Sequence, residues 1–120
     1  MANVLIIEDD AALQEAYSFM LSLDGHALTS AYNGNEGLDE TAKQTFDIIL
    51  LDIHMPIMNG IQFLEQFKDS RPETTRVIVF SNMIEPEIEK QVLELCADMC
   101  ILKSSATPSS ILAQVQELAP

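Results

Sequence analysis

The sequence predicts an α/β fold in which an open parallel sheet is covered by helices on both faces. Five short apolar runs recur along the chain, and stretches with the apolar spacing of helices separate them. The runs are apolar at consecutive positions, which is typical of strands that are buried on both faces of a parallel sheet. With 120 residues, 48% of them hydrophobic, the chain suits one domain with one core, which we expect to span residues 1–120.

The individual elements follow from the same pattern. The expected strands are residues 4–7, 27–31, 48–51, 77–80 and 99–102. Thr29 and Ser30 weaken the second run, as expected of an edge strand. Pro86 and Pro108 predict the first turns of the fourth and fifth helices, and Asn59 precedes the apolar spacing of the third. Right-handed crossovers between five such strand–helix units place helices on both faces of the sheet.

Composition excludes several classes of function. Nineteen acidic and six basic side chains give a net charge of −13, which repels the phosphates of DNA and RNA. Each apolar run is too short to cross a membrane, and no basic and apolar leader follows Met1, so we expect a cytoplasmic protein without membrane contact. Cys96 and Cys100 lack the second ligand pair of a zinc site and are expected to be reduced thiols. His26 is expected to be an ordinary turn residue.

Polar side chains follow four of the five expected strands. In an open parallel α/β sheet the binding site lies beyond the carboxyl ends of the strands, so these residues are expected to share one edge. They are Glu8, Asp9 and Asp10 after the first strand, Asp52 after the third, Ser81 after the fourth and Lys103 after the fifth.

Three carboxylates at one edge require positive charge. At about 4 Å and an effective dielectric constant near 20, each pair repels by about 4 kcal/mol. Lys103 supplies one charge, and an oxygen-rich cluster suits Mg²⁺, which commonly uses one or two carboxylates together with water and phosphate. Simpler explanations exist for single residues, because acids favour a helix start, Asp52 and Ser81 could cap helices, and Lys103 could be solvated. They do not explain why all these residues share an edge.

Four segments of the sequence resemble the receiver domain of bacterial response regulators, which belong to two-component and phosphorelay signalling systems. These segments are "VLIIEDD", "DIILLDIHMPIMNG", "VIVFSN" and "CILK". The resemblance covers essentially the whole chain. It implies a flavodoxin-like sheet of order 2-1-3-4-5 with five helices, and a phosphoacceptor that is not an enzyme but assists its own phosphorylation and dephosphorylation. It implies, as partners, a sensor histidine kinase or phosphotransfer protein and an unknown downstream protein.

The resemblance also assigns roles to residues. Asp52 matches the aspartate that accepts the phosphoryl group from phosphohistidine. Asp9 matches the main Mg²⁺ ligand, with Glu8 assisting through water and the backbone carbonyl of His54 completing the protein ligands. Lys103 is expected to pair with a phosphoryl oxygen. Ser81 is expected to donate a hydrogen bond after transfer and so to switch the region between the fourth strand and the fourth helix. Asp10 falls outside the acidic pair and is assigned to the helix start.

Three positions depart from the family pattern. Cys100 stands where an aromatic residue is usual, so a switch by reorientation of a ring is not expected. Ser104 replaces a proline that is commonly preceded by a cis bond, and we predict a trans bond between Lys103 and Ser104 because a cis bond there costs about 2.5–4 kcal/mol. Cys96 replaces a glycine near the end of the fourth helix, which leaves the shape of that loop open.

Other functions fit the sequence less well. An aspartate-nucleophile phosphatase typically needs a second acid two positions after the nucleophile, where this chain has His54, and a flavin-binding module needs a phosphate loop unlike the acidic residues 8–10. A stronger alternative is a receiver-like adaptor that is never phosphorylated and that binds proteins through an acidic helix. That helix carries Glu85, Glu87, Glu89 and Glu94.

Overall fold

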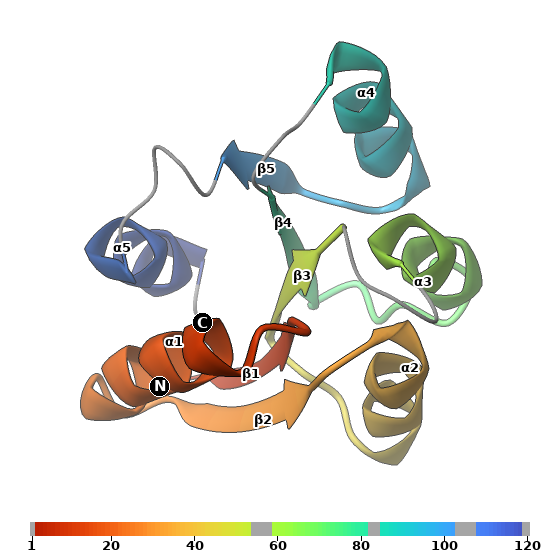
Figure 1. Cartoon of the computed structure of the whole chain (residues 1–120). Coiled ribbons are helices and arrows are strands. Elements are labelled where there is room, and N and C mark those ends of the chain that lie inside the picture. The colour runs from red at the N-terminus through yellow and green to blue at the C-terminus, as the bar shows by residue number, and fades with distance from the viewer. Residues whose placement is uncertain (1, 54–58, 82–84, 103–107, 119–120) are drawn as a thin grey trace.

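The computed structural model describes residues 2–53, 59–81, 85–102 and 108–118, and strands and helices alternate through these ranges (Figure 1). The strands are β1 (Asn3–Ile7), β2 (Ala27–Ala31), β3 (Ile48–Asp52), β4 (Arg76–Ser81) and β5 (Met99–Leu102). The helices are α1 (Ala11–Leu23), α2 (Gly34–Lys43), α3 (Gly60–Phe67), α4 (Pro86–Leu95) and α5 (Pro108–Leu118). Every predicted strand is confirmed to within one residue at each end.

The strands form one parallel sheet in the order β2-β1-β3-β4-β5, which confirms the expected fold class. The weak second run is an edge strand, as predicted. Ile7 of β1 pairs with Ala31 of β2 on one side and with Leu51 of β3 on the other. The carboxyl ends of the strands therefore lie at one common edge of the sheet.

Two apolar layers hold helices against the sheet, because successive side chains of a strand point to opposite faces. Leu5 and Ile7 pack in the layer that contains Phe63 of α3 and Val92 of α4. The other layer lies under α1 and α5, and its members include Val4, Ile6, Tyr17, Leu21, Ile111 and Val115. Figure 1 shows α1 and α5 on one side of the sheet and α2, α3 and α4 on the other. Burial of each such aliphatic side chain contributes about 1.5–3 kcal/mol to folding.

The helix boundaries follow local signals in the sequence. Pro86 occupies the first turn of α4, as predicted. Asn59 forms a capping box with Gln62 at the start of α3, in which each side chain accepts from the other residue's backbone N–H. At the end of α4, Cys96 has an extended φ of −172°, so this loop does not need the positive φ that a glycine would supply.

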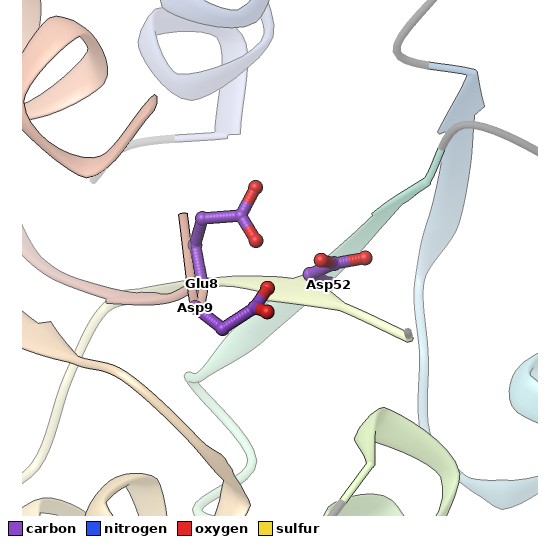
Figure 2. Close-up of side chains that lie close together, drawn as sticks. All are labelled: Glu8, Asp9 and Asp52. Atoms are coloured by element: carbon purple, nitrogen blue, oxygen red, sulfur yellow. The ribbon is translucent and has the colours of Figure 1, made fainter. Parts of the chain in front are cut away.

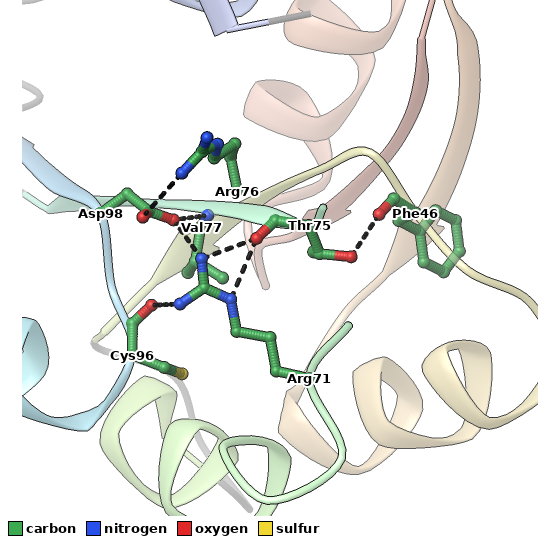
Figure 3. A network of polar contacts seen from close by, with 7 residues as sticks. All are labelled: Phe46, Arg71, Thr75, Arg76, Val77, Cys96 and Asp98. Carbon is green, nitrogen blue, oxygen red and sulfur yellow. Dashed lines mark hydrogen bonds and ion pairs between the residues drawn. The ribbon is translucent and has the colours of Figure 1, made fainter. Parts of the chain in front are cut away.

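A network around Arg71 ties together the amino ends of β4 and β5, at the opposite edge of the sheet (Figure 3). The Arg71 guanidinium donates to the Thr75 carbonyl at 2.7 and 3.0 Å, to the Cys96 carbonyl at 2.6 Å and to the Asp98 carboxylate at 2.7 Å. The same Asp98 carboxylate accepts from the Val77 N–H at 2.7 Å. The guanidinium thus joins the α3–β4 connection to the end of α4 and the start of β5.

His26 is more than an ordinary turn residue, and the sequence expectation is wrong here. Its side chain is buried, and Nδ1 accepts a hydrogen bond from the Ala2 N–H at 3.0 Å. That contact leaves the ring hydrogen for Nε2, which lies 3.1 Å from the Asp24 carboxylate. Gln116 of α5 donates to the same carboxylate oxygen at 3.0 Å, so His26 and Asp24 connect the first residues to α5.

Candidate functional site

The carboxylates of Glu8, Asp9 and Asp52 form one group, in which one oxygen from each lies within 4.8 Å of the others. We call these three residues the carboxylate group. Figure 2 shows their side chains pointing toward a shared space between the ends of β1 and β3. The structure therefore brings together three of the residues that the sequence predicts at this edge.

Strand register accounts for this proximity. Glu8 follows Ile7 and Asp52 follows Leu51, and Ile7 and Leu51 are paired residues of neighbouring strands. Glu8 and Asp52 are therefore adjacent where β1 and β3 end. Glu8 is 0% exposed and Asp52 is 3% exposed, whereas Asp9 is exposed to solvent. The group is thus buried on the side of the sheet and open to solvent at Asp9.

This arrangement concentrates negative charge. Two unit charges 4.8 Å apart, which is the upper limit of the oxygen separations in this group, repel by about 3.5 kcal/mol at an effective dielectric constant of about 20. Within the described residues, several basic side chains form ion pairs with acids outside this group, and they are Lys43, Arg71, Arg76 and Lys90. Three convergent carboxylates are hard oxygen ligands, so the donor set fits a divalent cation such as Mg²⁺.

Asp10 has a different role from the two acids that precede it. It is the N-cap of α1, and its Oδ1 accepts from the N–H groups of Ala12 at 2.9 Å and Leu13 at 3.2 Å. The simple explanation of acids at a helix start therefore applies to Asp10, which the sequence resemblance also assigns to that position. It does not apply to Glu8 or Asp9, which precede the cap.

Ser81 ends β4 one position beyond Phe80, the residue that pairs with Asp52. Ser81 is fully buried, and its hydroxyl has no hydrogen-bond partner within the ranges that the structure describes. Ser81 is not a helix cap, because Glu85 occupies the N-cap position of α4, and Asp52 is not one either, because Asn59 is the N-cap of α3.

Several sequence predictions fall outside the described residues. They concern the His54 carbonyl, the Lys103 ammonium group and the bond between Lys103 and Ser104. The acidic residues at the start of and within α4 do lie in the described part, and Glu85, Glu87, Glu89 and Glu94 are all exposed.

Two residues that support the carboxylate group were not predicted from the sequence. Gly60 donates its N–H to the Ile53 carbonyl at 2.9 Å and packs against the end of β3. Gln14 is 1% exposed, and its amide donates to backbone carbonyls at the ends of β1 and β2. Gln14 shares the buried face of α1 with Tyr17 and Leu21, so a polar residue within an apolar helical stripe was the signal available in the sequence.

The two cysteines are free and half-buried. Burial, with a smaller effect of the Glu89 carboxylate, raises the pKa of the Cys100 thiol to about 11. Burial also raises the pKa of Cys96, against the lowering effect of Arg71. Both side chains are therefore protonated at neutral pH.

The chain is similar to response regulators in sequence. A family model described as the response regulator receiver domain matches residues 4–116. A transcriptional regulatory protein CpxR homolog of Haemophilus influenzae is 30% identical over 98% of this chain and 58% of the relative. The cell cycle response regulator CtrA of Brucella ovis is 33% identical over 80% of this chain and 41% of the relative. The chain thus spans less than two thirds of the length of these relatives.

Solved structures give the same result. A CheY-like response regulator receiver domain protein from Methanospirillum hungatei superimposes with a TM-score of 0.91, at 27% identity, over 98% of this chain and 92% of that one. The chemotaxis protein CheY4 of Vibrio cholerae superimposes with a TM-score of 0.89, at 26% identity, over 98% of each chain.

Receiver domains are phosphoacceptors, are generally not enzymes, and bind Mg²⁺ at an acidic pocket. In the described part of this chain, no helix has the length and apolar character needed to cross a membrane. The parallel sheet of order β2-β1-β3-β4-β5, the acidic group at its carboxyl edge and the family match over residues 4–116 agree with one another. The chain belongs to the response regulator receiver domain family.

Proposed function

We propose that this chain is phosphorylated on Asp52 by a sensor histidine kinase or a phosphotransfer protein of the cytoplasm, with Mg²⁺ held at the carboxylate group. We further propose that residues 1–120 act as one receiver domain. The observation that carries the proposal is the position of Asp52. Its carboxylate lies at the end of a central strand, is 3% exposed, and has an oxygen within 4.8 Å of oxygens of Glu8 and Asp9.

In the proposed transfer, a carboxylate oxygen of Asp52 attacks the phosphorus atom of a phosphohistidine. A P–O bond forms and the P–N bond breaks, and its electron pair returns to the imidazole nitrogen. When bound, Mg²⁺ neutralises charge on the Asp52 carboxylate and on the phosphoryl oxygens. Asp9, Glu8, Asp52 and the backbone carbonyl of His54 would hold the ion, and together with water they give the oxygen ligands that Mg²⁺ prefers.

Two further side chains are proposed to bind the phosphoryl group. The Lys103 ammonium group pairs with one phosphoryl oxygen, and the Ser81 hydroxyl donates a hydrogen bond to another. Support for Ser81 is its burial at the end of β4 without a hydrogen-bond partner in the described ranges, because a buried hydroxyl of this kind gains energy when an acceptor arrives. This gain would draw the β4–α4 connection toward the phosphoryl group and alter the surface that a downstream protein binds.

The chain alone, with a small phosphodonor, tests the proposal. Incubation with acetyl phosphate and Mg²⁺ should add one phosphoryl group by intact-mass spectrometry, and the addition should fail in Asp52→Asn and after chelation of the metal. Asp10→Asn is the matched control, because asparagine keeps the N-cap of α1 while removing one nearby acid, and it should still be phosphorylated.

The contrary result is equally specific. If the parent chain acquires no phosphoryl group under conditions where it binds Mg²⁺, or if Asp52→Asn is modified equally well, then Asp52 is not the acceptor. The first result favours the adaptor that is never phosphorylated, which would act through the acidic residues of α4.

A further inference from the structure

We propose that Gln14 is a positioning residue that sets the Mg²⁺ affinity of the carboxylate group by fixing the backbone that carries Glu8 and Asp9. This inference rests on the proposed metal site and names a residue outside its ligands. The Gln14 side-chain amide donates to three backbone carbonyls at the ends of β1 and β2. They belong to Ile6 at 2.8 Å, Ala31 at 2.8 Å and Glu8 at 3.3 Å.

These contacts differ in strength. A glutamine amide has two N–H hydrogens, so the two contacts at 2.8 Å are the primary hydrogen bonds, and the Glu8 carbonyl shares one of the hydrogens. The Ala31 carbonyl also accepts from the backbone N–H of Glu8 at 3.0 Å. The Glu8 backbone is thus tied to β2 through its N–H and to α1 through its carbonyl.

Gln14 also holds the other end of the acidic segment. Its backbone N–H donates to the Asp10 carbonyl at 3.0 Å, which is the first hydrogen bond of α1. Asp9 therefore lies between two residues whose carbonyls both accept from Gln14, one from its side chain and one from its main chain. The position of the Asp9 carboxylate, the exposed member of the carboxylate group, depends on this connection.

Packing alone does not explain a glutamine at this position. Gln14 is 1% exposed and shares the buried face of α1 with Tyr17 and Leu21. Its Oε1 atom has no hydrogen-bond partner in the described residues, which makes burial of the amide costly. An apolar side chain would avoid this cost, but it would give no N–H groups to the strand ends. The hydrogen bonds to the backbone of the acidic segment therefore account for the residue type.

The test is a Mg²⁺ titration of Gln14→Met, which keeps the length of the side chain and removes its N–H donors. Titration followed by NMR amide shifts gives the dissociation constant and shows in the same spectra that the chain is folded. We expect the dissociation constant to rise about tenfold or more, as is usual when a residue that orients metal ligands is lost.

Ser18→Ala is the matched control. Ser18 lies one turn further along α1, and its buried hydroxyl has no hydrogen-bond partner in the described part of the chain. Its removal should leave the dissociation constant unchanged. Asp9→Asn should weaken binding more than any other variant, because it removes a proposed ligand.

The outcomes separate this inference from the proposed function. If the parent chain does not bind Mg²⁺, the proposed function fails. If the parent binds and Gln14→Met binds within twofold of it, Gln14 does not position the site and the proposed function stands. Gln14→Asn, whose shorter amide cannot keep all three contacts, is the second variant and should also bind more weakly. If neither variant folds while Ser18→Ala does, the inference is overturned, because Gln14 is then needed for the fold itself.

Discussion

Gly60 packs directly against the backbone of Asp52. A Cβ atom at position 60 would lie 2.5 Å from the Asp52 carbonyl oxygen and 2.8 Å from the Ile53 Cα. Because both neighbours are backbone atoms, neither can move aside by changing a rotamer. A side chain at position 60 would therefore displace either the first turn of α3 or the strand end that carries Asp52.

Gly60→Ala should lower the free energy of unfolding by about 2–3 kcal/mol because of this overlap. Urea unfolding followed by circular dichroism measures the change. Gly25→Ala is the control, because Gly25 has a φ of +87° but a Cβ atom there would meet nothing within 4 Å, so only the backbone cost of about 1 kcal/mol applies. Equal losses in the two variants would show that the contact with Asp52 is not the cause.

Ser81→Ala should leave the unphosphorylated chain as stable as the parent or slightly more stable. The substitution removes a buried hydroxyl that has no partner in the described residues, so no hydrogen bond is lost. Thr75→Val should lower the free energy of unfolding by about 1–2 kcal/mol, because the Thr75 hydroxyl donates to the Phe46 carbonyl at 2.6 Å. Urea unfolding of both variants compares the loss of a hydroxyl that has no partner with the loss of a hydroxyl that has one. A larger fall in the free energy of unfolding for Ser81→Ala than for Thr75→Val would show that the Ser81 hydroxyl does have a partner.

Arg71→Met should be strongly destabilising. It leaves the carbonyls of Thr75 and Cys96 and the carboxylate of Asp98 without their guanidinium donor, at a cost of about 2–4 kcal/mol. Lys90→Met is the control, because Lys90 lies 4.0 Å from Glu94 and both side chains are largely exposed, and it should change stability by less than about 0.5 kcal/mol. Thermal or urea unfolding distinguishes the two, and similar small effects would mean that the Arg71 network does not hold β4 and β5 together.

The Cys100 thiol should react slowly in the folded chain. Because burial raises its pKa from 9.0 to about 11, the thiolate fraction at pH 8 is about a hundredfold lower than in the unfolded chain. Alkylation by iodoacetamide, followed by mass spectrometry with and without urea, should show a difference of that order. In the Cys100→Ser variant the same measurement gives the alkylation of Cys96 alone.

The same shift predicts a pH dependence of stability. The unfolded thiol loses its proton near pH 9 and the folded thiol near pH 11, so the unfolded state binds fewer protons between these values. The free energy of unfolding should therefore fall as the pH rises from about 9 to about 11, and it should fall less in Cys100→Ser. If the free energy of unfolding falls with pH at the same slope in the parent chain and in Cys100→Ser, then folding does not raise the pKa of the Cys100 thiol.

The fold could be predicted because its signals are local. Runs such as residues 48–51 are apolar at every position, and prolines such as Pro86 mark a helix start, so neither requires knowledge of distant neighbours. The proximity of Glu8 and Asp52 could be predicted for a related reason. Parallel strands end at a common edge, and a residue that follows one strand lies near the residue that follows its neighbour.

The supporting contacts could not be predicted in this way. Arg71 reaches acceptors in separate segments of the chain, and nothing in its neighbouring sequence distinguishes it from a solvated surface arginine. His26 was misjudged for the same reason, because its partner Ala2 is 24 positions away. The sequence position of Cys96 alone also left the loop shape open, and only the structure shows its φ of −172°.

The three consecutive acids Glu8, Asp9 and Asp10 differ in which part of the structure a substitution would affect. Asp10 is committed to the backbone of α1, whereas the carboxylates of Glu8 and Asp9 point toward Asp52. Substitution of Glu8 or Asp9 can therefore change which cations the carboxylate group binds, while α1 still begins at the same residue. A substitution of Glu8 or Asp9 would thus change the oxygen ligands that face Asp52 and leave the N-cap hydrogen bonds of α1 in place.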